Sequence, residues 1–380
     1  MSKARDLADL AKNANDRLDT VATSDGALSN RNLIINGAMQ VAQRGASFTG
    51  VQTGAYQIDR WKSLFSGVST KGIATVTQST DAPSGFSHSY KMEVTTADTS
   101  LDPWAEYVVQ QRIEGQNLAA LKKGTADAES VTVSFWVKSS TTGTYILEIL
   151  DNQNSSRHIN KSYTINAANT WEYKTLTFAG DTSGTLTYNN TVSLELNWCL
   201  AGGSNFTGGA LQTSWGSLVQ SNRKVGQLNL YATNGNTWQI TGVQLEVGDT
   251  ATPFEHRSYG DELVRCQRYF ISYPYVDSAV GAVAYAPYAH GHAYSSDTIY
   301  AAQQFPTTMR VAPTFSSTGN HRAIYRNQGD SGGSLFLFDV SQTSGLLKYE
   351  STSTPFTIGE AAWISQENDA DARLLLDAEL

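Results

Sequence analysis

The chain has 380 residues, of which 40% are hydrophobic and 16% charged, and its formal net charge is -8. This length predicts two or three domains, each with a sizeable core. An acidic chain without a run of Lys and Arg lacks the positive surface that tracks phosphates, which excludes direct nucleic-acid binding. No stretch approaches the roughly 20 apolar residues of a membrane helix, so no membrane insertion is expected.

Small polar residues replace the missing charges. Ser and Thr together account for 79 residues and Gly for another 31, while aromatic residues remain at 10%. Such a composition is typical of strands joined by tight turns. The two cysteines, Cys199 and Cys266, are far apart, which excludes a disulfide scaffold or a cysteine zinc cluster. The first residues lack the apolar segment of a signal peptide, so we expect synthesis in a cytoplasm and retention there, unless the protein leaves by another route such as lysis.

Residues 3–21 carry the clearest helical pattern. Five apolar residues at spacings of 3, 4, 4 and 3 lie on one face of the predicted helix. A helix this short is marginal alone in water, so we expect it to pair with copies of itself or to dock on a larger particle. We therefore assign residues 1–30 to an N-terminal anchoring helix. The residues of the apolar face are Leu7, Leu10, Ala14, Leu18 and Val21.

Residues 31–258 show strand patterns. In 131–137, Val131, Val133, Phe135 and Val137 alternate with polar residues and with Trp136, which predicts a half-buried strand. About ten such segments without intervening helices predict a β-sandwich, with a jelly roll as the preferred topology. The expected strands are 32–37, 73–78, 90–95, 106–113, 131–137, 144–150, 160–165, 171–178, 192–198, 225–231 and 237–246.

Residues 259–380 are predicted to form a second, smaller β-sandwich. The segment 260–270 is briefly helical and marks a hinge between the domains. The fold class is therefore mainly β: an N-terminal helix, a jelly-roll sandwich and a smaller sandwich. The strands expected in the second sandwich are 281–285, 298–304, 322–326, 334–339, 346–349 and 371–376.

Two histidines are candidate metal ligands. His290 and His292 are two residues apart, so on a strand both imidazoles point to the same side. Two ligands do not close a site, but a threefold axis would supply six nitrogens to an octahedral ion. A structural metal ion is thus a candidate cofactor, with an exposed loop as the alternative interpretation.

Aromatic residues are the best candidates for ligand binding. Ring faces stack on the C–H faces of sugars, whereas most strand tryptophans belong to a core. Trp136 shares its predicted face with Thr132 and Ser134, and therefore points away from the apolar side. In the second sandwich, Tyr285 and Tyr288 belong to a stretch rich in Tyr and Pro. We expect these three rings to contact carbohydrate. Scattered Asp and Glu side chains could instead pair for glycoside hydrolysis, but no local acid motif indicates a hydrolase.

Three stretches in a fixed order carry a family resemblance. They are Asn32–Gly45 with Tyr56–Trp61, Ile240–Gly248 with Ala251–Glu255, and Leu263–Phe270. This order resembles a family of tailed-phage virion proteins described as tail fibres or structural proteins. The phrases Phe135–Lys138 and Gly203–Phe206 and the ending Ala372–Glu379 are similar too.

The resemblance implies a jelly roll like those of carbohydrate-binding modules, an N-terminal segment anchored to other virion proteins, and a homotrimer. It supplies no catalytic or sugar-contacting residues. The expected function is therefore a non-enzymatic fibre or spike subunit of a virion that attaches to a host-surface glycan. One alternative is a head fibre or decoration protein on the capsid. A second alternative is an enzyme, a depolymerase of surface polysaccharide.

Overall fold

The computed structural model describes residues 30–67, 72–153, 156–273, 286–326, 328–369 and 371–380. The chain divides into two compact units. One contains residues up to 40 and 46–257, and the other contains 41–45 and 258–380. The division at Arg257 and Ser258 lies one residue from the predicted domain boundary, but residues 41–45, predicted within the jelly roll, belong to the C-terminal unit. The predicted N-terminal helix lies outside the described residues.

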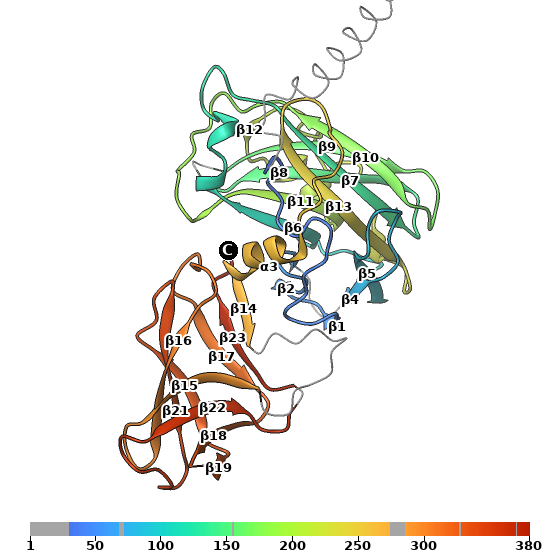
Figure 1. Ribbon diagram of the computed structural model, residues 1–380. Helices are drawn as coiled ribbons and strands as arrows, with labels where there is room; N and C mark the ends of the chain where they lie inside the picture. Colours follow the sequence, from blue (N-terminus) through green and yellow to red (C-terminus); the bar gives the residue numbers. More distant parts are fainter. Residues whose placement is uncertain (1–29, 68–71, 154–155, 274–285, 327, 370) are drawn as a thin grey trace, which may run out of the picture. The chain divides into compact units, whose positions relative to one another are not determined.

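The first unit is a β-sandwich of two antiparallel sheets (Figure 1). In the nested strand order, β13 lies between β5 and β7, and β11 between β8 and β6, as in a jelly roll. The six-stranded sheet contains β1 (Ser47–Val51), β4 (Ile73–Ser79), β5 (Ser89–Thr96), β13 (Thr237–Val247), β7 (Val131–Ser139) and β10 (Glu172–Phe178). The seven-stranded sheet contains β12 (Gly216–Ser217), β9 (Arg157–Ile165), β8 (Gly143–Asp151), β11 (Val192–Gly202), β6 (Glu106–Glu114), β3 (Lys62–Ser66) and β2 (Ala55–Tyr56).

Alternation along the strands builds the core of this unit. Phe135 from β7 meets Trp198 from β11 edge-on at 5.9 Å, and Trp61 contacts the same indole at 5.4 Å. All three rings are fully buried. The short helices lie in the connections: η1 (Gly115–Asn117), η2 (Ala119–Leu121), α2 (Ser204–Thr207), η3 (Gln220–Asn222) and η4 (Leu230–Ala232).

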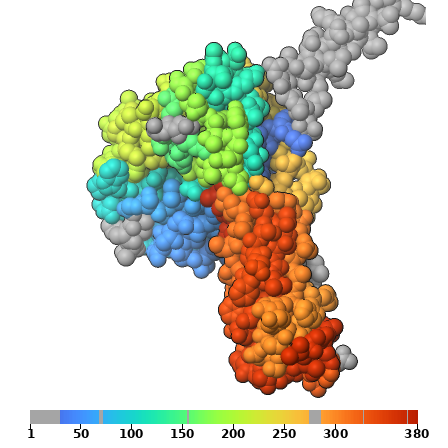
Figure 2. Space-filling view, turned by 90° about the vertical axis from the view of Figure 1, so that its left-hand side faces the viewer, coloured from blue at the N-terminus to red at the C-terminus, as the bar shows by residue number. Residues whose placement is uncertain are grey.

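The C-terminal unit is a second sandwich, and on the face drawn in Figure 2 its surface is formed by the orange to red residues. Its three-stranded sheet contains β14 (Phe270–Tyr273), β23 (Arg373–Asp377) and β17 (Thr314–Thr318). Its seven-stranded sheet contains β19 (Gln328–Ser331), β18 (His321–Tyr325), β22 (Ala361–Gln366), β15 (Pro287–Ala293), β16 (Thr298–Gln304), β21 (Ser344–Glu350) and β20 (Ser334–Phe338). The prediction of a mainly β chain with sandwich sheets is confirmed.

The predicted helix at 260–270 is α3 (Tyr259–Gln267). Its start follows from the sequence, because the Ser258 hydroxyl accepts a hydrogen bond from the Asp261 amide at 3.2 Å and caps the first turn. Acidic Asp261 and Glu262 occupy that first turn and basic Arg265 the last turn, as the helix dipole favours.

Two strand predictions are wrong. Residues 32–37 form no strand: residues 32–34 are irregular, and the chain bends and turns from residue 35, where Asn36 adopts a positive φ of 57°. Residues 225–231 form irregular backbone ending in η4. There, Leu230 and Tyr231 are buried without belonging to a sheet.

Candidate functional site

The structure separates the predicted ligand-binding residues. Trp136 lies half-buried on the outer face of the six-stranded sheet. Tyr288 is only 8% exposed, and its hydroxyl lies 3.1 Å from the ring nitrogen of His321. We therefore correct its prediction as a surface sugar contact, because its neighbours in the core cover it. Tyr285 lies outside the described residues. His290 and His292 are both exposed on β15.

Trp136 belongs to an aromatic pair on the jelly roll. In the register of β7 and β10, Tyr173 lies directly opposite Trp136, and their ring centroids are 5.3 Å apart. Tyr173 is 45% exposed. Cross-strand neighbours on one face have Cβ atoms about 5 Å apart, which brings the two rings together. The result is a broad ring surface on the outside of the sheet.

A polar frame lies beside this pair. Lys138 and Gln239 are opposite each other on β7 and β13. Asp81 accepts hydrogen bonds from Lys138 Nζ at 2.6 Å, from Trp171 Nε1 at 3.2 Å and from Gln239 Nε2 at 3.3 Å. Partial burial raises the pKa of Asp81, but these three donors outweigh it and lower the pKa below its usual value. Trp136, Tyr173, Trp171, Lys138, Asp81 and Gln239 are called the aromatic platform below.

The turn that presents Trp171 is held by one carboxylate. Glu172 accepts hydrogen bonds from the amides of Asn166 and Ala167 at 2.7 and 2.8 Å, and from Lys174 Nζ at 2.6 Å. Desolvation raises the pKa of Glu172, but the hydrogen bonds from these donors outweigh it and lower the pKa to about 2. The carboxylate is therefore ionised at neutral pH and fixes the loop from which the Trp171 indole reaches Asp81.

Further aromatic rings cover the neighbouring part of the same face. Phe86, Phe254 and His256 form a mutual cluster with centroid distances of 4.9 to 5.3 Å. Phe86 lies over Gly242, where a Cβ would come within 2.6 Å of the ring. Gly242 interrupts the register of β13 directly after Thr241, the residue opposite Trp136. The cluster therefore adjoins the aromatic platform at the bulge of β13.

A buried ion network occupies the outer face of the other sheet. Glu148 on β8 is fully buried and accepts a forked pair of hydrogen bonds from Arg223, at 2.8 and 2.7 Å. Glu106 on β6 pairs with Lys224 and lies 3.2 Å from Arg223. Burial raises the pKa of both carboxyls, but the charges of Arg223 and Lys224 lower it, well below the usual value for Glu148. The network joins distant parts of the chain, because Arg223 and Glu148 are 75 residues apart and Lys224 and Glu106 are 118 residues apart.

A third carboxylate, Glu195, lies on the neighbouring strand β11 and forms an ion pair with Arg112 at 2.9 Å. Burial raises its pKa above the ordinary value, although the charge of Arg112 opposes that shift. Enzymes that hydrolyse by acid–base catalysis use two carboxyl groups whose pKa values are shifted in opposite directions. Here Glu195 is 4% exposed and Glu148 is 0% exposed. Glu148 holds the segment that carries Arg223 through its two hydrogen bonds, whereas Glu195 is held by Arg112.

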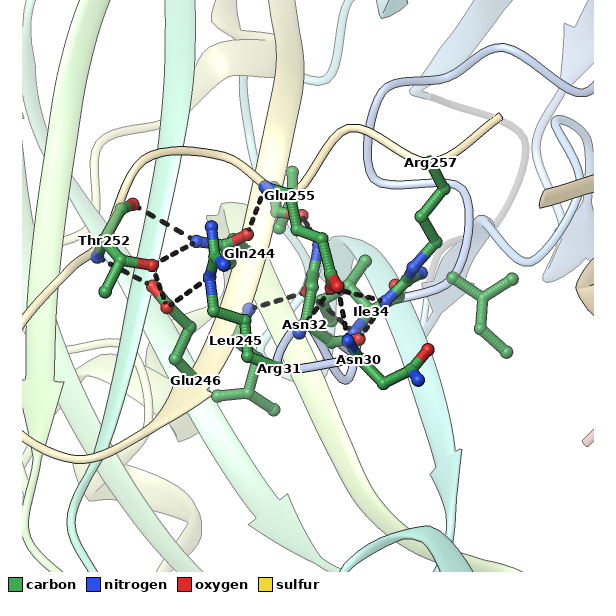
Figure 3. Close-up of polar contacts among 12 residues, drawn as sticks. Asn30, Arg31, Asn32, Ile34, Gln244, Leu245, Glu246, Thr252, Glu255 and Arg257 are labelled. Carbon is green, nitrogen blue, oxygen red and sulfur yellow. Dashed lines mark hydrogen bonds and ion pairs between the residues drawn. The ribbon is translucent and has the colours of Figure 1, made fainter. Parts of the chain in front are cut away.

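The residues that carry the family resemblance form a polar clasp in the first unit (Figure 3). The Asn32 amide group donates to the Val243 carbonyl at 3.1 Å and accepts from the Leu245 amide at 3.1 Å. Its backbone N–H donates to Glu255 Oε2 at 2.9 Å, and Gln244 Oε1 accepts from the Glu255 amide at 2.8 Å. These contacts tie residues 30–34 to the last strand of the sandwich.

Charged side chains close the clasp. Arg257 Nη1 donates to the Ile34 carbonyl at 3.0 Å, and Arg257 lies 3.2 Å from Glu255. On the other side Arg31 Nε lies 3.4 Å from Glu246, which also accepts from the Thr252 amide at 3.0 Å. Figure 3 shows Gln244 and Glu246 turned toward Thr252 and Glu255 toward the N-terminal residues. These motif residues are therefore occupied in holding the chain's entry into the sandwich.

Two more motif residues belong to the C-terminal unit. The guanidinium of Arg44 lies 3.5 Å from the ring centroid of Phe270 and pairs with Asp377 at 3.0 Å and with Glu379 at 3.3 Å. Gln43 Nε2 donates to the Phe270 carbonyl at 2.8 Å. The first motif thus contacts both the Leu263–Phe270 phrase and the C-terminal residues of the chain.

No group of three or more His, Cys, Asp or Glu suited to a metal ion occurs among the described residues. The predicted metal site at His290 and His292, which needs a threefold axis to supply further ligands, stays a prediction. In the same part of the chain, no helix combines the length and apolar character needed to cross a membrane.

No family model matches the chain, and no curated protein matches it. Solved structures similar to it include the enzymatically active domain of tailspike protein 4 from bacteriophage CBA120, with 16% identity, a TM-score of 0.31 and coverage of 57% of this chain and 21% of that chain. Another is a family 11 carbohydrate-binding module from Clostridium thermocellum in complex with a β-1,3-1,4-mixed-linked tetrasaccharide, with 12% identity, a TM-score of 0.27 and coverage of 56% and 98%. A third, TmCBM61 in complex with β-1,4-galactotriose, has 10% identity, a TM-score of 0.28 and coverage of 57% and 99%.

The chain therefore spans about a fifth of the tailspike chain and nearly all of the two modules. Because the identities are at most 16% and the TM-scores lie below 0.5, these likenesses transfer no function to this chain. What it binds must be judged from its own residues.

Proposed function

We propose that this protein is a non-enzymatic subunit of a tailed-phage virion fibre that attaches to a host-surface glycan through the aromatic platform. The observation that carries the glycan part is the pair of half-buried Trp136 and exposed Tyr173 on the outer face of the sheet, with ring centroids 5.3 Å apart. Ring faces of this kind stack on sugar C–H faces, and adjacent polar groups set orientation. The partly exposed ion pair of Lys138 and Asp81 supplies those groups beside the rings, and the buried Gln239 holds Asp81 in place.

The platform suits an uncharged saccharide. Lys138, the ammonium next to the rings, is paired with Asp81 at 2.6 Å, so the two charges offset each other. A neutral sugar needs no charged partner to bind at such a surface, whereas an anionic sugar would need an unpaired cation, which the six platform residues do not offer. Single sites of this type bind weakly, and several copies on one particle would give avid attachment.

The virion part of the proposal is supported by the ordered motifs and their resemblance to tailed-phage virion proteins. In the proposed particle the N-terminal segment, with Leu7, Leu10, Ala14, Leu18 and Val21 on its apolar face, binds other virion proteins, and three copies form the fibre. Assembly takes place in the host cytoplasm. Antibody labelling of intact particles locates the subunit, and label over the capsid instead of the tail would favour the head-fibre alternative.

Glycan binding is tested with the purified full chain and a printed array of neutral and acidic oligosaccharides. Replacing Trp136 or Tyr173 by Ala is expected to lower affinity for the bound sugar about tenfold, as the loss of one stacked ring implies. Trp104→Ala is the matched control, because Trp104 is 55% exposed in the same unit but lies outside the platform. Equal losses in the control and the platform variants would refute the assignment.

The depolymerase alternative has its own test. Host capsular material and lipopolysaccharide are incubated with the chain, and the supernatant is examined for released oligosaccharide. The proposal expects none. Release that disappears in Glu148→Gln or Glu195→Gln would make the carboxylates of the seven-stranded sheet catalytic and would overturn the non-enzymatic assignment.

A further inference from the structure

The outer face of the seven-stranded sheet in the C-terminal unit carries an unusual series of rings. Ala293 on β15, Ile299 on β16 and Ile364 on β22 are buried in the core. The residues that alternate with them along each strand therefore point outward. The outward positions hold Trp363 on β22, His290 and His292 on β15, Tyr300 on β16, Lys348 on β21 and Phe336 on β20. We call these six residues the C-terminal row.

The register places these side chains directly beside one another. Trp363 is opposite His290, with ring centroids 6.4 Å apart. His292 is opposite Tyr300, and Tyr300 is opposite Lys348. At about 4.8 Å per strand, the row from β22 to β20 extends about 19 Å over four intervals. That is longer than any single sugar ring and suits a short extended chain.

The row ends in exposed aromatic surface. Phe336 is opposite Lys348 and is 39% exposed, and Phe338 beside it is 42% exposed. The Lys348 ammonium lies 5.5 Å from the Phe336 centroid and pairs with Glu350 at 2.9 Å. Its charge is therefore offset within the row, as that of Lys138 is in the aromatic platform.

We infer that the C-terminal row is a second saccharide-binding surface, which takes a neutral oligosaccharide laid across β22, β15, β16, β21 and β20. Ring faces at Trp363, Tyr300 and Phe336 stack on successive sugars. The imidazoles of His290 and His292 and the Tyr300 hydroxyl supply hydrogen bonds to sugar hydroxyls. The inference rests on the proposed function in that it assigns the same class of ligand.

The composition of the row favours a sugar over a second copy of the chain. The cores of protein interfaces are depleted in Lys and in charged residues generally. This row contains an ion-paired ammonium, that of Lys348 on β21, and two exposed imidazoles among its rings. Alternating ring faces and hydrogen-bonding groups instead match the alternating C–H and hydroxyl faces of a sugar.

The experiment measures binding of the full chain to neutral tetrasaccharides of glucose, galactose and mannose on a printed array. Affinity for the ligand of the row is then measured by calorimetry. Trp363→Ala and Phe336→Ser are each expected to weaken that binding about tenfold. Tyr300→Phe keeps the ring and the fold while removing the hydroxyl, and is expected to cause a smaller loss. Trp104→Ala, which is exposed in the other unit and lies outside both ring surfaces, is the matched control. Trp136→Ala is measured alongside it to report on the aromatic platform.

The outcomes separate the two proposals. Binding that is lost entirely in Trp136→Ala and unaffected in Trp363→Ala overturns the row and leaves the proposed function intact. Binding lost only in the row variants supports the row and refutes the platform, and no binding to any array sugar overturns both. Dissociation of an oligomer by Phe336→Ser in sedimentation, with sugar binding retained, would make the row a protein interface and would also overturn the inference.

Discussion

Removing Arg223 should destabilise the jelly-roll unit more than any exposed charge change. Arg223→Met deletes two charge-assisted hydrogen bonds, of 2.8 and 2.7 Å, to a carboxylate that is fully buried. Each such bond contributes about 1.5–3 kcal/mol, and breaking one side of a buried pair costs about 3–5 kcal/mol. Glu148 keeps hydrogen-bond contacts to Asn197 at 3.1 Å and to His158 at 3.2 Å. These partners soften the loss, so we expect about 3 kcal/mol.

Tryptophan fluorescence during urea unfolding measures this loss. Seven of the eight tryptophans lie in the first unit, and only Trp363 lies in the C-terminal one, so the signal reports mainly the jelly roll. For a domain of this size, 3 kcal/mol corresponds to a fall in Tm of about 6–12 °C. Lys122→Met is the matched control, because the Lys122–Glu129 pair is exposed by 55% and 30% and should contribute less than about 1 kcal/mol.

The double variant Arg223→Met, Glu148→Met isolates the cause. If the orphaned charge is what destabilises the single variant, removing Glu148 as well should restore a large part of the stability, because no unpaired carboxylate remains buried. A loss in Arg223→Met no larger than in Lys122→Met, or a double variant less stable than the single one, would refute this reasoning.

Three further predictions concern the same unit. The pKa values of Glu148 and Glu106 are lowered in the folded state. The stability that these carboxylates contribute is therefore complete above the ordinary carboxyl pKa of about 4.3 and is lost as the pH falls below it. Urea titrations from pH 5 to pH 3 should show a decrease in the free energy of unfolding, and a smaller decrease in Glu148→Gln. Gly242→Ala forces a side chain onto a φ of 61° and against Phe86, so it should cost at least about 1–2 kcal/mol in the same urea assay. Asn32→Ala leaves buried partners of β13 unsatisfied and should cost at least about 2 kcal/mol, and an unchanged midpoint would contradict the structural role of the clasp.

The strands with strict alternation could be predicted from the sequence. The segment 131–137 became β7 (Val131–Ser139), because apolar side chains at every second position have one way to reach a core. The same alternation correctly turned Trp136 outward. The segment 144–150, a short and nearly continuous apolar run, became the buried strand β8 (Gly143–Asp151). The segment 225–231 fails because Leu230 and Tyr231 enter the core from irregular backbone, and a hydrophobic pattern does not reveal that.

The partners of Trp136 could not be predicted. Tyr173 meets it through a pairing of β7 with β10, strands separated by two others in the chain, and alternation does not say which strands become neighbours. The ion network is harder still, because Arg223 lies in a loop 75 residues from Glu148. A charged side chain in a loop carries no sequence signal of burial, since most are solvated.

The motif residues hold the fold, whereas the exposed ring surfaces are available to a ligand. Asn32, Gln244 and Glu255 have polar atoms engaged inside the first unit, and Arg44 is engaged with Asp377 and Glu379 in the other. Polar atoms that are already hydrogen-bonded within the protein are not available to bind a ligand. A chain with the same motifs is therefore expected to keep these hydrogen bonds and ion pairs, whatever ligand it binds. Tyr173 and Phe336 carry no such constraint, because they point outward and are 45% and 39% exposed. A change of ligand is therefore expected at positions such as Tyr173 and Phe336, with the clasp unchanged.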